Sequence, residues 1–194
     1  MREESTTPSQ DRFVASMQRT GAWLASWESG ELSDEVLADR VADLVRDRDG
    51  ARGFFVVAMT SEIPLLDRQP EPLLATLRQA GEAVVDLTIR NLVMSSAMAV
   101  HHGRNNDDDQ REGSQRVQRR AWELLGQLRP EPVLRRLEPM LAASRIRAVH
   151  GEGDPAPGLP EAVVDDLAML RRWRYDHDQL AAIAAALERV ADPS

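Results

Sequence analysis

The stretch between Gly81 and His102 constrains the fold more than any other part of the sequence. Its apolar residues cover nearly the whole circumference of a helix, and only a narrow edge of Glu82, Asp86 and Arg90 is charged. A helix that is apolar nearly all round is usually buried. We therefore expect this segment to form the central helix of the fold, with the other elements packed around it.

Capping residues and apolar stripes divide the rest of the chain into further helices. Thr7 and Pro8 begin a helix that we expect to reach about Gly30. Ser33 caps a second helix, which we expect to stop at Asp49-Gly50. These signals predict two helices at the start of the chain.

The segment from Arg52 to Ser61 contains two Phe and two Val in a row, a pattern that suits a buried strand as well as a buried helix. The chain offers no second strand-like segment with which it could pair. Aromatic residues make up only 4% of the chain, so its core must rely on aliphatic side chains, which favours helix packing. We therefore predict a buried helix here and an all-α protein.

The later part of the chain shows the same kind of pattern. It predicts a short helix over 69–80, a polar connection over 103–113, a helix capped by Ser114, and a helix opened by Arg129-Pro130 that Pro139 bends or divides. The predicted fold is a compact irregular bundle of about seven or eight helices around the buried central helix.

One internal similarity offers an alternative. Pro-Glu-Pro-Leu-Leu at residues 70–74 returns as Pro-Glu-Pro-Val-Leu at residues 130–134, and a true repeat would indicate HEAT-like pairing of helices. The likeness does not extend into the segments that follow, and Pro-Glu-Pro is a good helix opening in itself. We therefore prefer the irregular bundle.

Composition divides the chain into four parts. We expect a flexible N-terminus over 1–8, a main helical domain over 9–148, a Gly/Pro-rich linker over 149–160, and a C-terminal helical hairpin over 161–192. The hairpin is expected to pack on the main domain.

The composition also excludes several classes of protein. All 24 basic residues are Arg, so no catalytic or phosphate-binding Lys exists, and the lack of Cys excludes thiolate chemistry and disulfide scaffolds. The net charge of −8 disfavours nucleic acid as a partner. A polar N-terminus and short apolar runs carry no signal for secretion or membrane insertion, so we expect a cytoplasmic protein with no membrane association.

The four His residues match no helical metal-binding template, because no Glu-x-x-His or His-Glu-x-x-His sequence occurs. A looser site could join His101 or His102 to the acidic residues 107–109. Two His residues at a helix C-terminus, followed by a solvated loop, explain the same pattern. We predict no metal site and no cofactor.

The clearest feature of the charge pattern is the segment from Arg111 to Arg147, where nine Arg face four Glu, a local charge of +5. Two interpretations have equal weight. The segment either docks an acidic protein or pairs with acidic helices of the same chain. The candidate docking residues are Arg116, Arg119, Arg120, Arg135 and Arg136.

Trp23 is a further candidate for an interface anchor, since Trp is enriched in binding hot spots. It stands four residues before Trp27 on the first helix, so both side chains could face the same way. The alternative is that the pair belongs to the core.

A separate candidate site lies on the central helix. Asp86, Arg90, Asn91 and His101 are polar groups on a helix that we expect to be buried, and such groups either pair with one another or line a pocket. The pocket hypothesis requires that these four side chains converge.

Missing catalytic templates and the Arg-rich segment together favour a non-enzymatic helical adaptor, assembly or regulatory protein that acts through protein–protein contacts. An acidic protein is the expected partner, and self-association is compatible with this hypothesis. The alternative is a helical enzyme, or a ligand or metal carrier, that uses the polar residues of the central helix. RNA binding through the Arg-rich segment is a third hypothesis.

Overall fold

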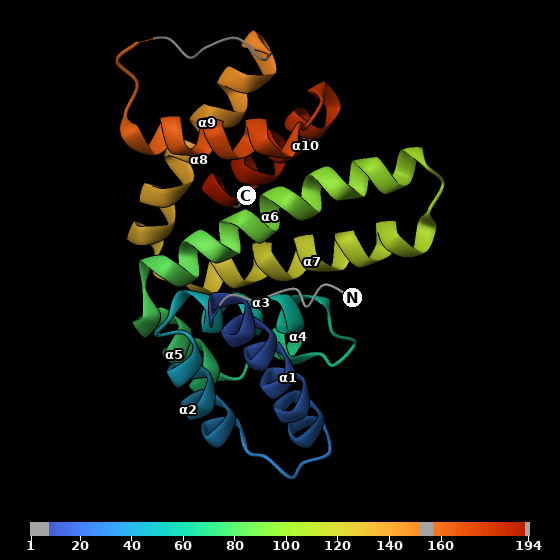
Figure 1. The fold of residues 1–194 in the computed structure, drawn as a ribbon, viewed down its shortest axis with the longest axis vertical. Coiled ribbons are helices and arrows are strands. Elements are labelled where there is room, and N and C mark those ends of the chain that lie inside the picture. The colour runs from blue at the N-terminus through green and yellow to red at the C-terminus, as the bar shows by residue number, and fades with distance from the viewer. Residues whose placement is uncertain (1–7, 152–156, 193–194) are drawn as a thin grey trace, which may run out of the picture. The chain divides into compact units, whose positions relative to one another are not determined.

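The structure is a computed structural model that describes residues 8–151 and 157–192, and Figure 1 shows its fold. The described residues form ten helices and no strand, which confirms the all-α fold class. The number exceeds the predicted seven or eight. One of the additional helices is the four-residue α4 (Leu65–Arg68), whose preceding Pro64 provides no side-chain cap that could mark it in the sequence.

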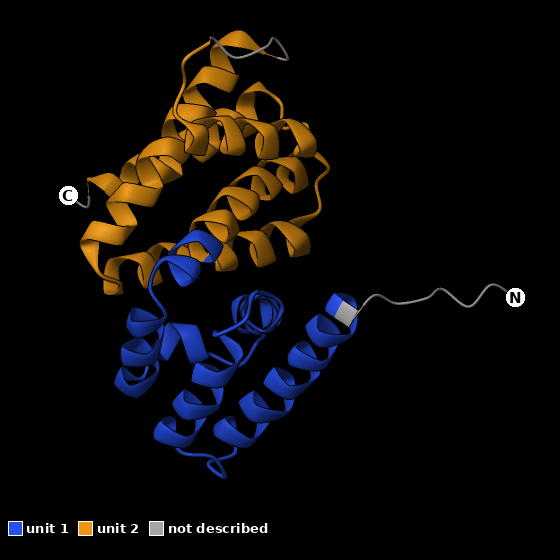
Figure 2. Cartoon of the chain, turned by 60° about the vertical axis from the view of Figure 1, so that its left-hand side comes forward, with its two compact units in different colours: residues 1–87 blue, residues 88–194 orange. Residues whose placement is uncertain are grey.

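The packing of the helices divides the chain into two compact units, residues 1–87 and residues 88–194, which Figure 2 colours separately. The division falls inside α6 (Glu82–Arg104), the apolar helix expected at the centre of the fold. Composition placed a linker at 149–160 instead, and residues 152–156 of that segment lie outside the described part of the chain.

The first unit consists of five helices and the first residues of α6. The five helices are α1 (Pro8–Glu28), α2 (Asp34–Leu44), α3 (Arg48–Thr60), α4 and α5 (Glu71–Ala80). α1 packs along α3, and α2 packs against α5. Phe54 and Phe55 in α3 are both buried, which confirms the predicted buried helix in this segment.

Gly53 brings α1 and α3 close together. A Cβ atom at this position would lie 1.8 Å from the Ser16 Oγ and 2.9 Å from the carbonyl oxygen of Phe13. Ser16 is itself buried and donates a hydrogen bond to the Phe13 carbonyl at 2.7 Å. Gly is therefore the residue that this helix crossing requires.

The second unit contains most of α6 and four further helices. They are α7 (Asp108–Gln127), α8 (Pro130–His150), α9 (Glu161–Trp173) and α10 (His177–Ala191). The segment predicted as a C-terminal hairpin forms two helices, α9 and α10, each of which packs against α8, while α10 also contacts α7. The buried Gln179 of α10 donates a hydrogen bond to the carbonyl oxygen of Ala97 in α6 at 3.1 Å.

The polar connection predicted over 103–113 is wrong. α6 continues to Arg104, and α7 begins at Asp108 rather than after Ser114. The Asp107 side chain accepts a hydrogen bond from the Gln110 backbone N–H at 3.2 Å and so caps the helix. Acidic residues in a first turn interact favourably with the helix dipole, which explains why this charged sequence is helical.

A second predicted boundary differs for a similar reason. Ser33 caps the N-terminus of α2, as predicted. The predicted end is wrong, because α2 stops at Leu44 and not at Asp49-Gly50. Asp47 then caps α3 by accepting hydrogen bonds from the backbone N–H groups of the next turn, so Gly50 lies inside that helix. The predicted Thr7 cap lies outside the described residues.

Both Pro-Glu-Pro sequences open helices, α5 and α8, as expected. Pro139 does not divide α8, which runs through it as one helix to His150.

One described helix, α6, is long and apolar enough by length and composition to cross a membrane, although we expected no such segment. Half of its most apolar 18-residue window is buried inside the structure. The core helix of a soluble protein meets the same criterion, so composition does not decide between the two.

Candidate functional site

The Arg-rich segment is largely paired inside its own unit. Arg136 in α8 makes a bidentate ion pair with Asp166 in α9, with both N–O distances at 2.7 Å. The Asp166 side chain is only 2% exposed. Arg145, also in α8, reaches Glu188 of α10 at 2.5 Å. These pairs fix both helices of the C-terminal hairpin to α8.

Two more Arg residues of the segment are buried. Arg120 is 2% exposed and Arg147 is 5% exposed. Arg120 and Arg136 were both candidates for partner binding, but the structure places the first in the interior and the second in an internal ion pair. Of the two interpretations of the segment, pairing within the chain accounts for Arg136, and burial removes Arg120 from the surface.

The charges of the two units agree with this result. Residues 1–87 contain nine Arg against sixteen Asp and Glu, a net charge of −7. Residues 88–194 contain fifteen Arg against sixteen acidic residues, a net charge of −1. The +5 of the Arg-rich segment is therefore balanced within its own unit, mainly by acidic residues of the C-terminal hairpin.

The remaining candidates of the segment differ in their surroundings. Arg116 is half-buried, and Arg135 is exposed and lies 3.7 Å from Glu131 one turn earlier on α8. Arg119 is exposed and lines a groove on the surface of the second unit. Arg119 is thus the candidate whose position suits contact with another molecule.

The groove has two hollows, which we call the polar half and the apolar half of the Trp122 groove. The polar half has a volume of about 370 Å³ and is walled by α7 and α10. Its lining includes Gln115, Gln118, Arg119 and Arg189. Trp122 and Glu123 line both halves, so the two hollows adjoin at these residues.

The apolar half has a volume of about 420 Å³ and lies where the end of α7, the start of α8 and the end of α10 meet. Its aliphatic lining is formed by Leu125, Leu128, Pro130, Val133, Leu134, Val190 and Ala191. Leu134, in this wall, is 50% exposed. The hollow thus presents aliphatic surface to solvent.

Trp122 is held in place by its neighbours. The Arg189 guanidinium lies over the indole ring, 4.0 Å from the ring centroid, in cation–π geometry. On the same wall, Gln118 Nε2 donates a hydrogen bond to Ser96 Oγ of α6 at 2.9 Å. These contacts hold side chains of the polar half in an ordered wall.

Sequence reasoning missed Trp122, although it follows Arg119 by three residues on the same helix. The spacing places both on one helix face. The rest of the lining comes from α8 and α10, which are distant in sequence, and this assembly could not be predicted from local patterns.

The structure places Trp23 in a smaller hollow of about 240 Å³ in the first unit, together with Arg12, Arg19 and Arg40. Trp23 is half-buried, and Arg40 lies over its ring at 5.6 Å from the centroid. Asp43 and Asp47 line the same hollow, so its charge is nearly balanced. Trp27 belongs to the core, as the alternative interpretation held.

The four polar residues proposed for a pocket on α6 are dispersed. Asp86 and Asn91 are half-buried, while Arg90 and His101 are exposed. Arg90 and His101 are eleven residues apart, about 16 Å along a helix axis. Arg90 contacts the sulfur of Met169 at 2.9 Å, whereas His101 contacts the side chain of Asn105. None of the four lines the three hollows described above.

Among the described residues, no group of three or more His, Asp or Glu side chains is placed to hold a metal ion. The His101 and His102 rings pack edge to face, with centroids 5.4 Å apart.

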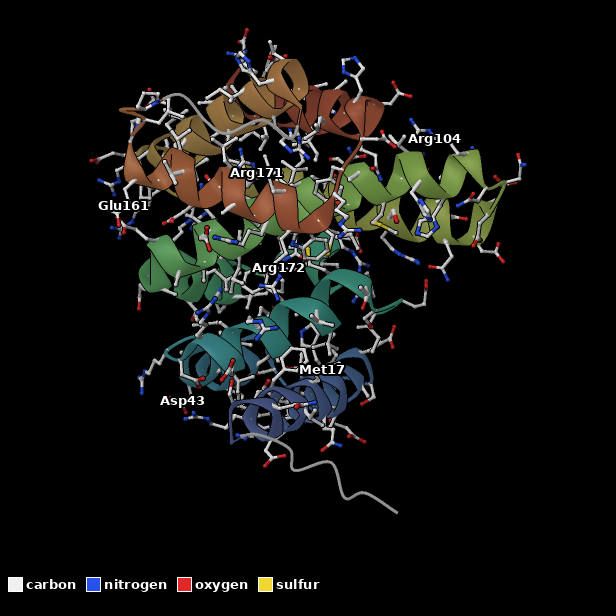
Figure 3. All side chains as sticks on the ribbon, turned by 45° about the horizontal axis from the view of Figure 1, so that its top comes forward. Met17, Asp43, Arg104, Glu161, Arg171 and Arg172 are labelled. Carbon is white, nitrogen blue, oxygen red and sulfur yellow. The ribbon has the colours of Figure 1, made fainter. Side chains whose placement is uncertain are left out.

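A further polar cluster lies at the turn between α9 and α10, outside the groove. Arg104, labelled at the end of α6 in Figure 3, donates hydrogen bonds to Asp176 and Asp178. The Arg104 guanidinium, followed by the Gln179 backbone N–H, holds the pKa of Asp176 below its usual value. Burial raises the pKa of the neighbouring Tyr175 to about 12, so its hydroxyl stays protonated at neutral pH.

The protein is thus an all-α chain whose second unit has an open groove lined by Trp, Arg and aliphatic side chains. The chain belongs to the family described as "Uncharacterised conserved protein UCP020893", whose profile matches residues 12–190. No curated protein and no solved structure matches the chain. Because the family description names no activity, the function has to be argued from the groove.

Proposed function

We propose that this protein is a non-enzymatic helical adaptor, assembly or regulatory protein, and that it binds a partner protein in the Trp122 groove. The observation that carries the proposal is the composition of the groove. Trp122 lies at its centre, Arg119 and Arg189 line one half, and the exposed Leu134 lines the other. Trp and Arg dominate the binding energy of protein interfaces, and apolar side chains fill the interface core.

The shape of the groove supports a protein partner more than a small ligand. Its lining extends from Gln115 of α7 to Leu128, the C-cap residue thirteen positions further on, which corresponds to about 20 Å. Small-molecule sites enclose most of their ligand, whereas this groove is long and open along one side of three helices. A segment of secondary structure fits such a surface.

The alternative function, an enzyme or carrier built on α6, receives less support. Its four polar residues are spread along the helix and have different exposures. Reacting groups or ligand-binding groups must converge on one point in space. The groove is the place in the second unit where Trp, Arg and aliphatic groups come together.

The proposal is tested by two single substitutions on α8. Leu134→Asp places a charge in the apolar half of the groove, and Val149→Asp is the matched control, because Val149 is 77% exposed on the same helix outside the groove. Tagged wild-type protein and both variants are used to capture proteins from a nuclease-treated lysate of the source organism. Bound proteins are quantified by mass spectrometry, and the same eluates are assayed for metals and small molecules.

We expect one protein to be captured in near-equal amount with the wild type and with Val149→Asp, and to be lost with Leu134→Asp. Burying an unpaired carboxylate in an interface core costs several kcal/mol, so the loss should be at least about a hundredfold. Equal capture by both variants would show that the groove is not the contact surface. A bound metal or small molecule with no protein partner would favour the carrier hypothesis.

A further inference from the structure

We propose that the hollow around Trp23 in the first unit, which we call the Trp23 hollow, binds a phosphate monoester group. The hollow has a volume of about 240 Å³. Its charged and aromatic lining consists of Arg12, Arg19 and Trp23 of α1, Arg40 and Asp43 of α2, and Asp47, the N-cap of α3. This site is separate from the Trp122 groove, and the proposal does not depend on the function of that groove.

α1 contributes a row of hydrogen-bond donors to the hollow. Arg12, Arg19 and Trp23 occupy positions i, i+7 and i+11, which lie on one face of a helix. Both Arg side chains are exposed, and Trp23 is half-buried. Two guanidinium groups and an indole N–H therefore come to the hollow from one side of a single rigid element.

The guanidinium groups that line the hollow form no ion pair with any carboxylate of the described residues. Arg19 makes neither a hydrogen bond nor an ion pair there. Arg40 contacts the ring of Trp23, 5.6 Å from the centroid. Arg12 interacts electrostatically with Asp49 but forms no ion pair within 4.0 Å among these residues. All three cations thus keep capacity to donate to an added acceptor.

The indole N–H of Trp23 is a further donor of this kind. It donates to no residue that the structure describes. Trp27, one turn later on the same helix, differs, because its Nε1 donates a hydrogen bond to the Asp34 carboxylate at 2.6 Å. The two Trp residues of α1 therefore differ in whether the indole N–H has an acceptor.

The two carboxylates of the lining already have partners. Asp43, labelled in Figure 3, pairs with Arg46 at 3.1 Å. Asp47 Oδ1 accepts hydrogen bonds from the backbone N–H groups of Asp49 and Gly50, both at 3.0 Å. With Arg46 counted, four cations accompany two carboxylates in and beside the hollow. What the hollow lacks is an acceptor for its donors.

A phosphate monoester supplies such acceptors. Guanidinium groups bind the oxygens of carboxylates and phosphates with strong charge-assisted hydrogen bonds. A carboxylate has two oxygens and a single charge, whereas a phosphate monoester has three terminal oxygens and a charge of about −1.5 to −2 at neutral pH. Three guanidinium groups and an indole N–H match the phosphate better than the carboxylate.

The size and setting of the hollow define the ligand further. Its volume lies below the range of about 300 to 1,000 Å³ that is typical of small-molecule sites. It therefore suits a phosphate group and the few atoms that carry it, and not a whole nucleotide. The first unit has a net charge of −7, which gives an anion no long-range attraction, so binding must rest on direct contacts.

The proposal is tested by titrating the full-length, isotope-labelled protein with inorganic phosphate at constant pH and ionic strength. Proton–nitrogen NMR spectra resolve the indole N–H signals of the four Trp residues, and Trp23→Phe identifies the signal of Trp23. Trp27 is the internal control, because its N–H is held by Asp34. Parallel titrations use a phosphoserine peptide, the same peptide without phosphate, and succinate, a dianion whose charge lies on carboxylates.

We expect the Trp23 signal to shift and to saturate with phosphate, while the Trp27 signal stays in place. Arg19→Gln should weaken phosphate binding at least about tenfold. Arg48→Gln is the charge-matched control and should leave binding unchanged, because Arg48 is exposed in the same unit and does not line the hollow. Thermal unfolding of both variants checks that the fold is retained.

The two sources of a phosphate group give different results. Tighter binding of the phosphoserine peptide than of inorganic phosphate would identify a phosphorylated protein segment as the ligand, and equal or weaker binding would identify free phosphate or a small ester. Four results would overturn the proposal: no saturable shift of Trp23, equal binding of succinate and phosphate, equal binding of the two peptides, or equal binding by wild type and Arg19→Gln.

Discussion

At the scale of single residues, the pair of Arg136 and Asp166 shows what the Arg-rich segment contributes. Asp166 is almost completely buried, and Arg136 reaches it with both nitrogens at 2.7 Å. Removing one member of such a pair leaves the other charge in a medium that solvates it poorly. The pair therefore matters for the stability of the hairpin more than for recognition of a partner.

We expect Arg136→Ala to lower the free energy of unfolding by about 3 kcal/mol, because it strands the buried carboxylate of Asp166. The control is Arg145→Ala, which removes the pair with Glu188. Both side chains of that pair are at least half exposed, so the expected loss is below about 1 kcal/mol.

Urea unfolding followed by circular dichroism measures both values. Replacing both members of the buried pair by Leu should restore most of the lost stability, since two apolar groups leave no unpaired charge behind. Equal losses in the two single variants would contradict the assignment of Arg136 as a buried structural residue.

The sequence singled out the Arg-rich segment, but it could not distinguish a docking surface from ion pairs within the chain. Arg136 and Asp166 are thirty residues apart, and nothing local in either helix marks them as partners. The same holds for Trp122. Its cation–π partner, Arg189, lies on α10, far from Trp122 in the sequence. Pairings of this kind depend on tertiary structure and not on periodicity.

At the scale of elements, the contact between α1 and α3 depends on the absence of a side chain at Gly53. We expect Gly53→Ala to lower the free energy of unfolding by about 2 to 3 kcal/mol, because the added methyl group overlaps with Ser16 and with a backbone carbonyl of α1. A matched control exists in Gly21 of α1, where an added Cβ atom would meet no neighbouring atom within 4 Å.

Gly21→Ala should raise stability by up to about 1 kcal/mol, since Ala is the better helix former. Thermal and urea unfolding of the two variants would therefore change in opposite directions. A neutral Gly53→Ala substitution would mean that the two helices can separate at little cost.

The turn between α9 and α10 gives a prediction that depends on pH. Asp176 is the N-cap of α10, and its pKa is lowered first by the hydrogen bond from Arg104 and then by the backbone of Gln179. A carboxylate with a lowered pKa in the folded state stabilises the protein above its unfolded pKa, near about 4, and this contribution disappears as the pH falls.

We expect Asp176→Ala to lower the free energy of unfolding by about 1 kcal/mol at neutral pH, the usual value for an N-cap. Below about pH 4 the difference from the wild type should shrink, because both proteins then lack the charge. Asp165→Ala, a substitution on the exposed side of α9, serves as the control and should leave the free energy of unfolding at neutral pH close to that of the wild type. A difference that stayed constant from neutral pH to about pH 3 would contradict the role assigned to the carboxylate.

The helix boundaries show which sequence signals locate the start of a helix correctly. Caps with a short polar side chain directly before an apolar stripe, such as Ser33, were located correctly. The start of α7 was misplaced because three consecutive Asp residues resemble a solvated loop, although the first is an N-cap and the others lie in the first turn. A helix whose first turns are entirely polar has no apolar stripe by which to recognise it.

At the scale of the whole molecule, the packing around α6 bears on whether this apolar helix can enter a membrane. By composition it could cross a membrane, yet several of its polar groups are engaged within the second unit. Ser96 accepts a hydrogen bond from Gln118 of α7, and the carbonyl of Ala97 accepts one from Gln179 of α10. Moving α6 into a bilayer would break these bonds and expose the apolar faces of the helices that cover it.

We therefore expect the folded protein to remain in the lower fractions when it is centrifuged with floating vesicles of phosphatidylcholine and phosphatidylglycerol. The positive control is a synthetic peptide of residues 82–104, which presents the same helix without its partners and should rise with the vesicles. Flotation of the folded protein would show that this surface is released at a membrane, and α6 would then be a membrane-binding element.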